Sequence, residues 1–153
     1  NEAALVQALE HIEQARSLGA RVLCGGERWT GGRGYFLEPT ILVDVPSGAR
    51  CMNEETFAPV APVCVFDDEA EAIRQANATE YGLAAYAFTR DLSRMWRLAE
   101  SLEAGTIGIN DTVPAASQCP FGGLKQSGWG RELGLEGLDA FLETKHISLG
   151  VQA

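Results

Sequence analysis

The sequence has no long apolar run, few histidines and no excess of cationic side chains. No stretch reaches the roughly 20 apolar residues that a membrane span needs, and residues 1–16 mix charge and alanine without the apolar stretch of a signal peptide. Lys and Arg total 12 against 21 Asp and Glu, a formal net charge of −9, which argues against binding to a nucleic acid backbone. These absences predict no membrane and no nucleic acid partner, and they favour small molecules or other proteins.

Cysteine and histidine are also sparse. The four cysteines form no C-x-x-C pair and lie far apart, mainly in apolar runs, at Cys24, Cys51, Cys64 and Cys119. This distribution predicts reduced thiols that pack in a reducing compartment, which favours the cytoplasm, because no local sequence supplies a base or a positive field to activate them. His11 and His146 are the only histidines, so no metal site is predicted.

The first 45 residues predict a helix followed by a hairpin or sheet edge. Apolar residues recur at helical spacing over residues 2–18, and Gly19 is typical of the position after a helix. A strand is expected at 21–24, and a glycine-rich loop then leads to an extended segment at 35–45. At 153 residues, the chain is long enough for one core and too short to suggest two independent domains.

The middle of the chain predicts a parallel α/β unit. The expected β-α-β-α-β order is a strand at 60–66, a helix at 68–78, a strand at 83–89, a helix at 92–103 and a strand at 106–110. Asp67 or Asp68 can cap the first of these helices and Asp91 the second. Because the strands are continuous apolar runs, we expect one parallel sheet with helices on both faces.

The C-terminal 40 residues predict a functional loop and an unpaired strand. An irregular stretch at 111–130 is long for a structureless loop inside a compact domain, and such loops are usually functional. A helix is expected at 135–142, followed by a strand at 145–150. That strand has no preceding partner within the α/β unit, so we expect it to pair with another segment or subunit.

Two segments are candidates for a binding role. The segment Asn53-Glu-Glu-Thr-Phe-Ala-Pro-Val60 holds two carboxylates and an aromatic ring just before a strand. Taken alone, it is also typical of a solvated helical turn with a core phenylalanine. In the functional interpretation, a carboxylate accepts two hydrogen bonds from a vicinal diol such as ribose, and the ring closes one side of a nicotinamide pocket. The glycine-rich segment 119–132 matches neither the phosphate-binding loop nor the dinucleotide fingerprint, and its glycines are typical of tight turns.

Together, these segments resemble the aldehyde dehydrogenase superfamily over essentially the whole chain. The matching motifs occur in the family's order and spacing: Gly34-Tyr-Phe-Leu-Glu-Pro-Thr-Ile41, Glu54-Glu-Thr-Phe-Ala-Pro59, Tyr81-Gly-Leu-Ala-Ala85, Thr89-Arg-Asp-Leu92, Glu103-Ala-Gly-Thr106, Asn110, Pro120-Phe-Gly-Gly123, Lys125, Ser127-Gly128 and Gly130-Arg-Glu132. One such match would be weak, but the ordered set is specific. The resemblance implies a C-terminal part of the catalytic domain over residues 1–143 and an oligomerisation strand and tail over 144–153.

The resemblance also implies a cofactor and roles for individual residues. The cofactor is NAD or NADP, with Glu55 binding the nicotinamide ribose, Phe57 lining the nicotinamide pocket and Leu83 near the same ring. Ala115 and Phe121 fall where the family lines its substrate tunnel. The family uses its last strand, here 144–150, in a sheet between subunits, so a homo-oligomer is expected. The residue that separates NAD from NADP is not among the matching motifs.

The chain departs from the family pattern in two respects. Ala58 stands where the family usually has glycine after the phenylalanine. The G-Q-x-C pattern of the catalytic cysteine and the E-L-G-G pattern of the general-base glutamate do not occur in the 153 residues. The resemblance places both patterns, and the Rossmann unit that binds the cofactor, N-terminal to Asn1. No catalytic residue is therefore assigned to this chain, and the isolated chain is expected to be inactive.

Within the family, the chain most resembles the succinate-semialdehyde dehydrogenase group. The likeness lies in Tyr81-Gly-Leu-Ala-Ala-Tyr86, Arg90-Asp-Leu-Ser-Arg94 and Gln118-Cys-Pro-Phe121. It implies an aldehyde with a distal acid. However, Ala115 occupies the position of a serine that commonly holds the substrate carboxylate, with Ser117 two residues on, so a longer, aromatic or otherwise anionic aldehyde remains open. A second hypothesis is a non-catalytic oligomerisation or binding module derived from this family.

Overall fold

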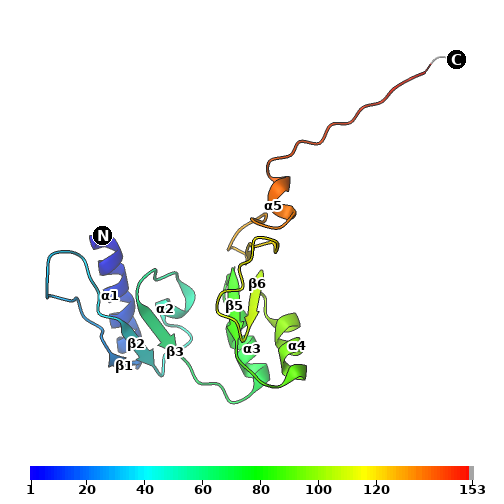
Figure 1. The fold of residues 1–153 in the computed structure, drawn as a ribbon. Helices are drawn as coiled ribbons and strands as arrows, with labels where there is room; N and C mark the ends of the chain where they lie inside the picture. The colour runs from blue at the N-terminus through cyan, green and yellow to red at the C-terminus, as the bar shows by residue number, and fades with distance from the viewer. Residues whose placement is uncertain (152–153) are drawn as a thin grey trace. The chain divides into compact units, whose positions relative to one another are not determined.

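A computed structural model describes residues 1–151 (Figure 1). The chain divides into two compact units, Asn1–Ala72 and Ile73–Ala153. The elements in chain order are α1 (Glu2–Ser17), β1 (Arg21–Cys24), β2 (Thr40–Val43), α2 (Arg50–Asn53), β3 (Val60–Val63), α3 (Glu69–Asn77), β4 (Tyr81–Gly82), β5 (Ala84–Ala87), α4 (Leu92–Ser101), β6 (Thr106–Ile109), β7 (Leu124–Lys125) and α5 (Glu136–Asp139). This division does not test the predicted boundary between residues 143 and 144, which stays a prediction.

Helix α1 begins and ends with local signals. The Asn1 side chain accepts a hydrogen bond from the Ala4 amide at 3.0 Å, which satisfies one of the amides that the first turn leaves free. After Leu18, the chain turns at Gly19 with φ 106°, a conformation that glycine adopts without steric cost. The predicted helix and its glycine terminus are therefore confirmed.

The first unit contains a three-stranded sheet in the order β1-β2-β3. Strand β2 pairs antiparallel with β1, as expected of the predicted hairpin, and parallel with β3, with Thr40 opposite Val60. At Gly25, just after β1, an added Cβ would collide with the Pro39 carbonyl, so only glycine fits there without a shift of the backbone. The hairpin therefore closes through a tight approach of two backbone segments.

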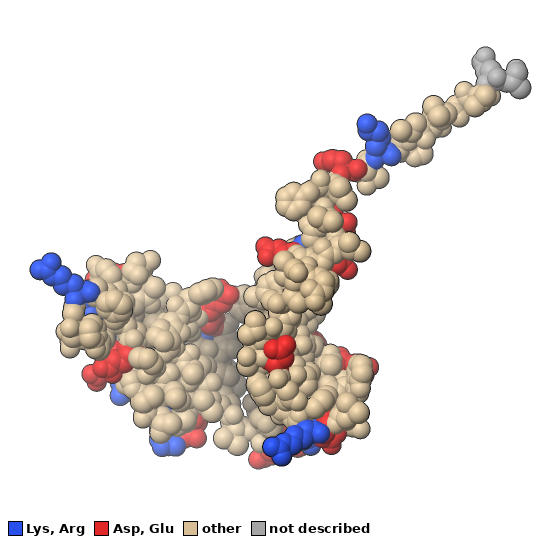
Figure 2. Space-filling model, in the orientation of Figure 1, with Lys and Arg blue, Asp and Glu red and all other residues tan. Residues whose placement is uncertain are grey.

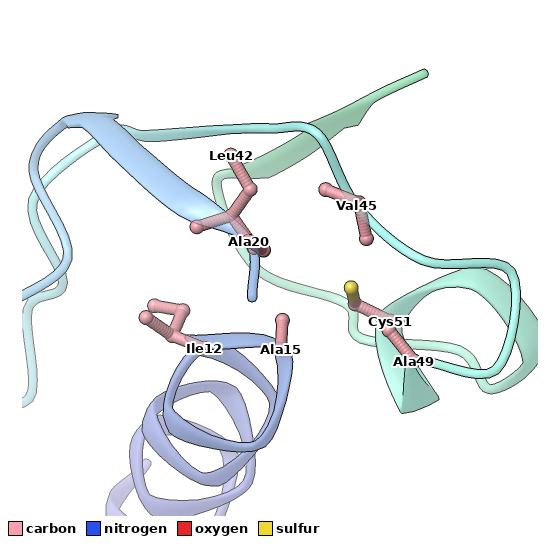
Figure 3. Close-up of a cluster of buried hydrophobic side chains, with 7 residues drawn as sticks. All are labelled: Ile12, Ala15, Ala20, Leu42, Val45, Ala49 and Cys51. Carbon is pink, nitrogen blue, oxygen red and sulfur yellow. The ribbon is translucent and has the colours of Figure 1, made fainter. Parts of the chain in front are cut away.

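The core of the first unit lies between α1 and this sheet (Figure 3). Its buried side chains are Ile12, Ala15, Ala20, Leu42, Val45, Ala49 and Cys51. Burial raises the pKa of the Cys51 thiol, which keeps it protonated at neutral pH. The expectation that cysteines pack rather than react therefore holds at this position.

The second unit contains a short parallel pair, β5 and β6, joined by α4. The Asp91 carboxylate accepts a hydrogen bond from the Arg94 amide at 2.9 Å and caps α4, while Asp68 caps α3 by accepting from the Glu71 amide at 2.8 Å. Both predicted caps are confirmed. Strand β4 pairs antiparallel with β7, which brings Tyr81 opposite Lys125.

The predicted single parallel βαβαβ sheet is not confirmed. The order of strands and helices is as predicted, but β3 belongs to the sheet of β1 and β2, whereas β5 and β6 form a sheet of two. The physical reason is that a crossover helix fixes the direction of the next strand without fixing its hydrogen-bonding neighbour. The parallel pairing of β5 with β6 is therefore as predicted, and a single sheet that includes β3 stays a prediction.

The C-terminal segment also differs from the expectation. The predicted helix at 135–142 is the single turn of α5, and residues 143–151 form no strand within the described chain. Their side chains are exposed. The predicted pairing of 144–150 with another subunit stays a prediction, and the tail residues 152 and 153 lie outside the described residues. Within residues 1–151, no helix is both long and apolar enough to cross a membrane.

Candidate functional site

The candidate site in the first unit is the loop Glu54-Glu55-Thr56-Phe57, here called the 54–57 loop. It follows α2 and precedes β3, and its far end is held where the Thr40 amide donates to the Pro59 carbonyl at 2.8 Å. Phe57 has φ 44°, a left-handed conformation that is uncommon for a bulky residue, and its side chain is 87% exposed. An exposed aromatic ring on a strained backbone is typical of a binding surface rather than of a core residue.

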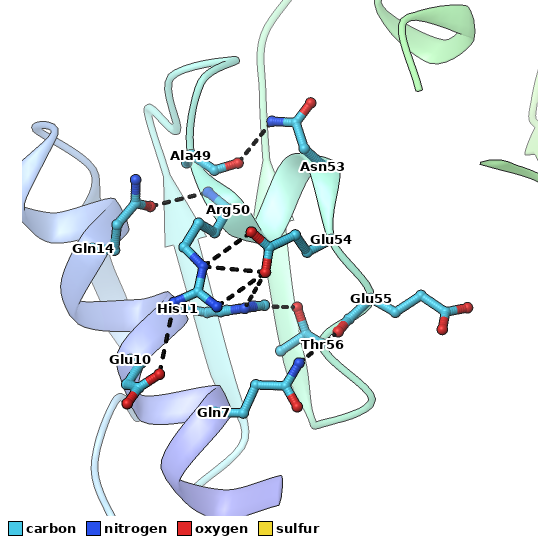
Figure 4. Close-up of polar contacts among 10 residues, drawn as sticks. All are labelled: Gln7, Glu10, His11, Gln14, Ala49, Arg50, Asn53, Glu54, Glu55 and Thr56. Carbon is cyan, nitrogen blue, oxygen red and sulfur yellow. Dashed lines mark hydrogen bonds and ion pairs between the residues drawn. The ribbon is translucent and has the colours of Figure 1, made fainter. Parts of the chain in front are cut away.

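Side chains from α1 hold this loop at consecutive residues (Figure 4). Gln7 donates through Nε2 to the Glu55 carbonyl at 3.1 Å, and His11 Nδ1 is hydrogen-bonded to the Thr56 hydroxyl at 3.0 Å. His11 Nε2 also lies 3.2 Å from a Glu54 carboxylate oxygen, without the alignment of a hydrogen bond. The loop is therefore attached to α1 by both backbone and side-chain contacts.

An ion pair completes the attachment at the start of the loop. Arg50 donates from Nε and Nη2 to the Glu54 carboxylate at 3.0–3.1 Å, and its Nη1 lies 3.7 Å from Glu10. The hydrogen bonds from Arg50 are the main reason why the pKa of Glu54 lies below its ordinary value, and they raise the pKa of Arg50 in return. Glu54 is therefore a structural carboxylate, already engaged within the first unit.

The neighbouring carboxylate of Glu55 is available for a ligand. Among the described residues, only its backbone carbonyl is engaged, and Figure 4 shows its side chain directed away from α1. A free, exposed carboxylate offers several lone pairs to the two hydroxyls of a diol, and the exposed Phe57 ring offers a flat apolar surface two residues on. These residues therefore fit the ribose and ring of a nicotinamide nucleotide.

Leu83 lies in the second unit, between β4 and β5. Its carbonyl accepts from the Thr106 amide at 3.1 Å, and the preceding Gly82 amide donates to the Ser127 hydroxyl at 2.9 Å. Lys125 fixes the same region by donating to the Asn77 and Thr79 carbonyls at 2.9 and 3.0 Å and by pairing with the Glu103 carboxylate at 2.6 Å. The backbone at Leu83 is thus fixed while its side chain is exposed.

The two candidate substrate residues also belong to the second unit. Phe121 exchanges two backbone hydrogen bonds of 2.7 Å with Glu132, and Arg131 donates to the nearby Gly123 carbonyl at 3.0 Å. The glycine-rich segment is therefore a turn structure held by its own backbone, as its glycines predicted. Ala115 is exposed in the irregular stretch before it. Glu55 and Phe57 thus lie two residues apart in the first unit, whereas Leu83, Ala115 and Phe121 lie at separate positions of the second.

Charge is scattered rather than gathered near these candidates. On the face drawn in Figure 2, Lys and Arg side chains lie singly or in small groups among acidic and uncharged residues. Within residues 1–151, no group of three or more His, Cys, Asp or Glu side chains has the arrangement of a metal site.

The residues that hold the 54–57 loop were not identified from the sequence. Gln7, His11 and Arg50 belong to none of the motifs described above. A signal was present, however, because His11 falls on the same helical face as the apolar Ala8 and Ile12. A polar residue on an otherwise apolar face predicts a buried hydrogen-bond partner elsewhere in the chain.

The fold and the motifs define a class of protein. The family model described as aldehyde dehydrogenase family matches residues 1–147, and the chain belongs to the aldehyde dehydrogenase family, as the motif order predicted. It is 50% identical to a succinate-semialdehyde dehydrogenase [NADP(+)] of Escherichia coli K12 over 99% of this chain and 31% of that protein. It is 49% identical to a glutarate-semialdehyde dehydrogenase of Pseudomonas putida KT2440 over 97% of this chain and 30% of that protein.

Solved structures give the same result. The chain matches the crystal structure of an Escherichia coli NADP-dependent enzyme with a TM-score of 0.92 and 49% identity, covering 99% of this chain and 31% of that one. It matches a betaine aldehyde dehydrogenase of Staphylococcus aureus, solved in complex with NAD+, with a TM-score of 0.91 and 40% identity over 96% of this chain and 30% of that one. The chain thus spans about three tenths of the length of these relatives.

Proposed function

We propose that this chain is the nicotinamide-orienting part of an NAD(P)-dependent aldehyde dehydrogenase, and that the whole protein oxidises a semialdehyde such as succinate semialdehyde to the carboxylic acid. The observation that carries the proposal is the 54–57 loop, which presents a free carboxylate and an 87% exposed phenyl ring while its backbone is held by α1. The semialdehyde substrates named for the two relatives support the substrate class.

This chain's own residues contribute positioning. Glu55 accepts hydrogen bonds from the two ribose hydroxyls, and Phe57 packs against the nicotinamide. Leu83, in the second unit, is proposed as a cofactor-binding residue on the family resemblance alone. When bound, the nicotinamide nucleotide supplies the hydride acceptor. Holding it in one orientation removes rotational freedom before reaction, which is a recognised source of rate enhancement. The catalytic thiol and general base belong to family patterns that do not occur in these 153 residues, so we propose that the isolated chain is inactive.

Substrate recognition is proposed for the second unit. Phe121 and Ala115 line the path of the aldehyde, and the small Ala115 leaves room where a hydroxyl would otherwise bind the distal acid. The Ser117 hydroxyl is the nearby polar group that can take that part. It donates to Gln118 Oε1 at 3.4 Å, and the Ser117 backbone carbonyl accepts from the Gly134 amide at 3.1 Å. A distal carboxylate therefore remains the favoured feature of the substrate.

The first test is a spectrophotometric assay of the full-length protein that contains this chain, with succinate semialdehyde and either NAD or NADP. Replacing Glu55 by Gln should lower kcat/KM for the nucleotide roughly tenfold or more, the size expected for losing hydrogen bonds to a charged acceptor. Glu13→Gln on the outer face of α1, where the carboxylate is exposed, is the matched control and should leave the rate unchanged. Unchanged nucleotide kinetics in Glu55→Gln would remove this residue from the mechanism.

A second candidate function is that of an oligomerisation or binding module derived from the family. The observation that favours it is the exposed, extended segment 143–151, which makes no strand within the described chain. In this case, residues 144–150 would add a strand to the sheet of another subunit. Deleting 144–153 should then convert an oligomer to a smaller species in light scattering, and a chain that oligomerises without any aldehyde oxidation by the full-length protein would favour this function.

A further inference from the structure

His11 is a polar residue whose side chain is completely buried on the inner face of α1. It lies on the inner face of α1 beside Ala8 and Ile12, and its side chain has no exposed surface. A buried imidazole is unfavourable unless its nitrogen atoms have partners. Its position therefore needs an explanation beyond packing, because an apolar side chain of similar size would fill the same space without that cost.

Both nitrogen atoms of His11 face the 54–57 loop. Nδ1 is hydrogen-bonded to Thr56, and Nε2 lies within 3.2 Å of the Glu54 carboxylate that Arg50 already binds. One turn earlier, Gln7 donates to the backbone carbonyl of Glu55. Residues 7 and 11 share one face of α1 because they are four apart, so a single helix face holds three consecutive loop residues (Figure 4).

The held residues are those next to the candidate ligand groups. Glu55 is attached through its carbonyl, which leaves its carboxylate free, and Thr56 immediately precedes Phe57 with its φ of 44°. A left-handed conformation at a bulky residue persists only where the surrounding structure imposes it. The hydrogen bond between His11 and Thr56 holds the residue immediately before Phe57 and can impose this conformation.

We infer that His11 is a positioning residue for nicotinamide binding: through Thr56 and together with Gln7, it sets the direction of the Glu55 carboxylate and the Phe57 ring. This inference rests on the proposed function of the loop. It assigns to α1 a role in cofactor binding that the helix fulfils without touching the cofactor. Glu54 and Arg50 fix the near end of the loop, and His11 fixes its centre.

The experiment uses four single variants of the full-length protein and the double variant His11→Phe with Thr56→Val. His11→Phe keeps a planar aromatic ring, which is somewhat larger, and removes both nitrogen atoms. Thr56→Val keeps the side-chain shape and removes the same hydrogen bond from the loop side. His11→Asn places a polar atom near the position of Nδ1 and should restore part of the contact. Glu13→Gln, on the opposite face of α1, is the control.

His11→Phe and Thr56→Val should each raise the KM for the nucleotide roughly threefold to tenfold, the size of one lost hydrogen bond. The aldehyde KM should stay unchanged, and the double variant should be no worse than either single one, because both remove one bond. His11→Asn should recover most of the affinity. Amide hydrogen exchange over 55–58 should become faster in the two damaging variants and stay unchanged in the control.

Two results would overturn the inference. One is an unchanged nucleotide KM and unchanged exchange over 55–58 in both variants. The other is a lower melting temperature with an unchanged nucleotide KM, which would make His11 a packing residue only. If His11→Phe fails to fold, Thr56→Val decides alone. If the wild-type protein oxidises no aldehyde, the proposed function fails, and the exchange measurement still decides whether His11 positions the loop.

Discussion

Each of the two units of this chain is stabilised internally by a different kind of interaction. The first buries large aliphatic side chains such as Ile12 and Leu42 between a helix and a sheet. In the described part of the second, the buried residues are three glycines, Gly82, Gly108 and Gly123. The first unit is therefore stabilised by burial of apolar side chains, and the second by backbone and polar contacts.

Helix α4 shows the difference most clearly. Its apolar residues recur at helical spacing, but Leu92 and Trp96 are 68% and 65% exposed, and none of its residues is buried. On α1, the corresponding face is buried at Leu5, Ala8, Ile12 and Ala15. An amphipathic pattern thus identifies which face of a helix can pack, but it does not identify the segment that covers that face.

Truncating a core side chain should give the largest effect and tests the first half of the comparison. Leu42→Ala removes a fully buried side chain and should lower the free energy of unfolding by about 2–5 kcal/mol. Leu92→Ala on α4 is the matched change in the second unit and should cost less than about 1 kcal/mol, because that side chain is mostly exposed already. Urea unfolding of the chain measures both, and equal losses would break the comparison.

Adding one methyl group tests the close backbone approach in the second unit. A Cβ at Gly105 would collide with the Gly122 carbonyl, so Gly105→Ala should cost about 1–3 kcal/mol as the two segments separate. The control is Gly48→Ala in the first unit, where an added Cβ meets no atom within 4 Å. Hydrogen exchange should show faster opening of β4 and β7 in Gly105→Ala only. If Gly105→Ala left the free energy of unfolding unchanged, the close contact between Gly105 and the Gly122 carbonyl would not be required for stability.

Removing one ammonium group tests the polar contacts of the second unit. Lys125→Met keeps most of the side-chain length and removes the contacts with Glu103 and with two carbonyls that α3 and its following turn leave free. The expected loss is about 1–2 kcal/mol, since charge-assisted hydrogen bonds are among the stronger ones. Lys145→Met in the exposed segment serves as the control. Thermal unfolding monitored by circular dichroism measures the difference, and equal melting temperatures would contradict it.

The smallest expected effect concerns acid and the Arg50–Glu54 pair. The folded state lowers the pKa of Glu54, so the pair contributes stability above the ordinary glutamate pKa and loses it as the pH falls through the lowered value. Glu54→Gln should therefore lower the free energy of unfolding at neutral pH. The difference in free energy of unfolding between this variant and the wild type should become smaller in acid. Because the pair is exposed, 1 M salt should weaken the effect. Urea unfolding midpoints between pH 7 and pH 3 test this prediction. A stability difference between variant and wild type that grows in acid would contradict it.

Local features were predictable from the sequence because each depends on neighbouring residues. The Asn1–Leu18 helix region, the caps at Asp68 and Asp91 and the turn at Gly19 all follow from interactions within four residues. The family followed from the order of motifs, each of which can be read without a structure. The presence of Glu55 and Phe57 beside a strand was predictable for the same reason.

Features that depend on distant segments were not predictable. Strand β3 pairs with β2, although α2 and the 54–57 loop separate the two strands in the sequence. The attachment of the 54–57 loop joins residues 45 and 48 positions apart, His11 to Thr56 and Gln7 to Glu55. No local pattern records such a pairing, although the polar residue on an apolar helix face indicated that one existed.

Helix α1 carries both the core residues of the first unit and the side chains that hold the 54–57 loop. Heating that detaches the helix from the sheet must therefore release Gln7 and His11 from the loop at the same moment. We expect loss of nucleotide affinity and melting of the first unit to occur at one temperature, with no intermediate range in which a folded unit has lost its binding geometry. Bound nucleotide should in turn raise that temperature, because it binds only the state in which α1 is docked.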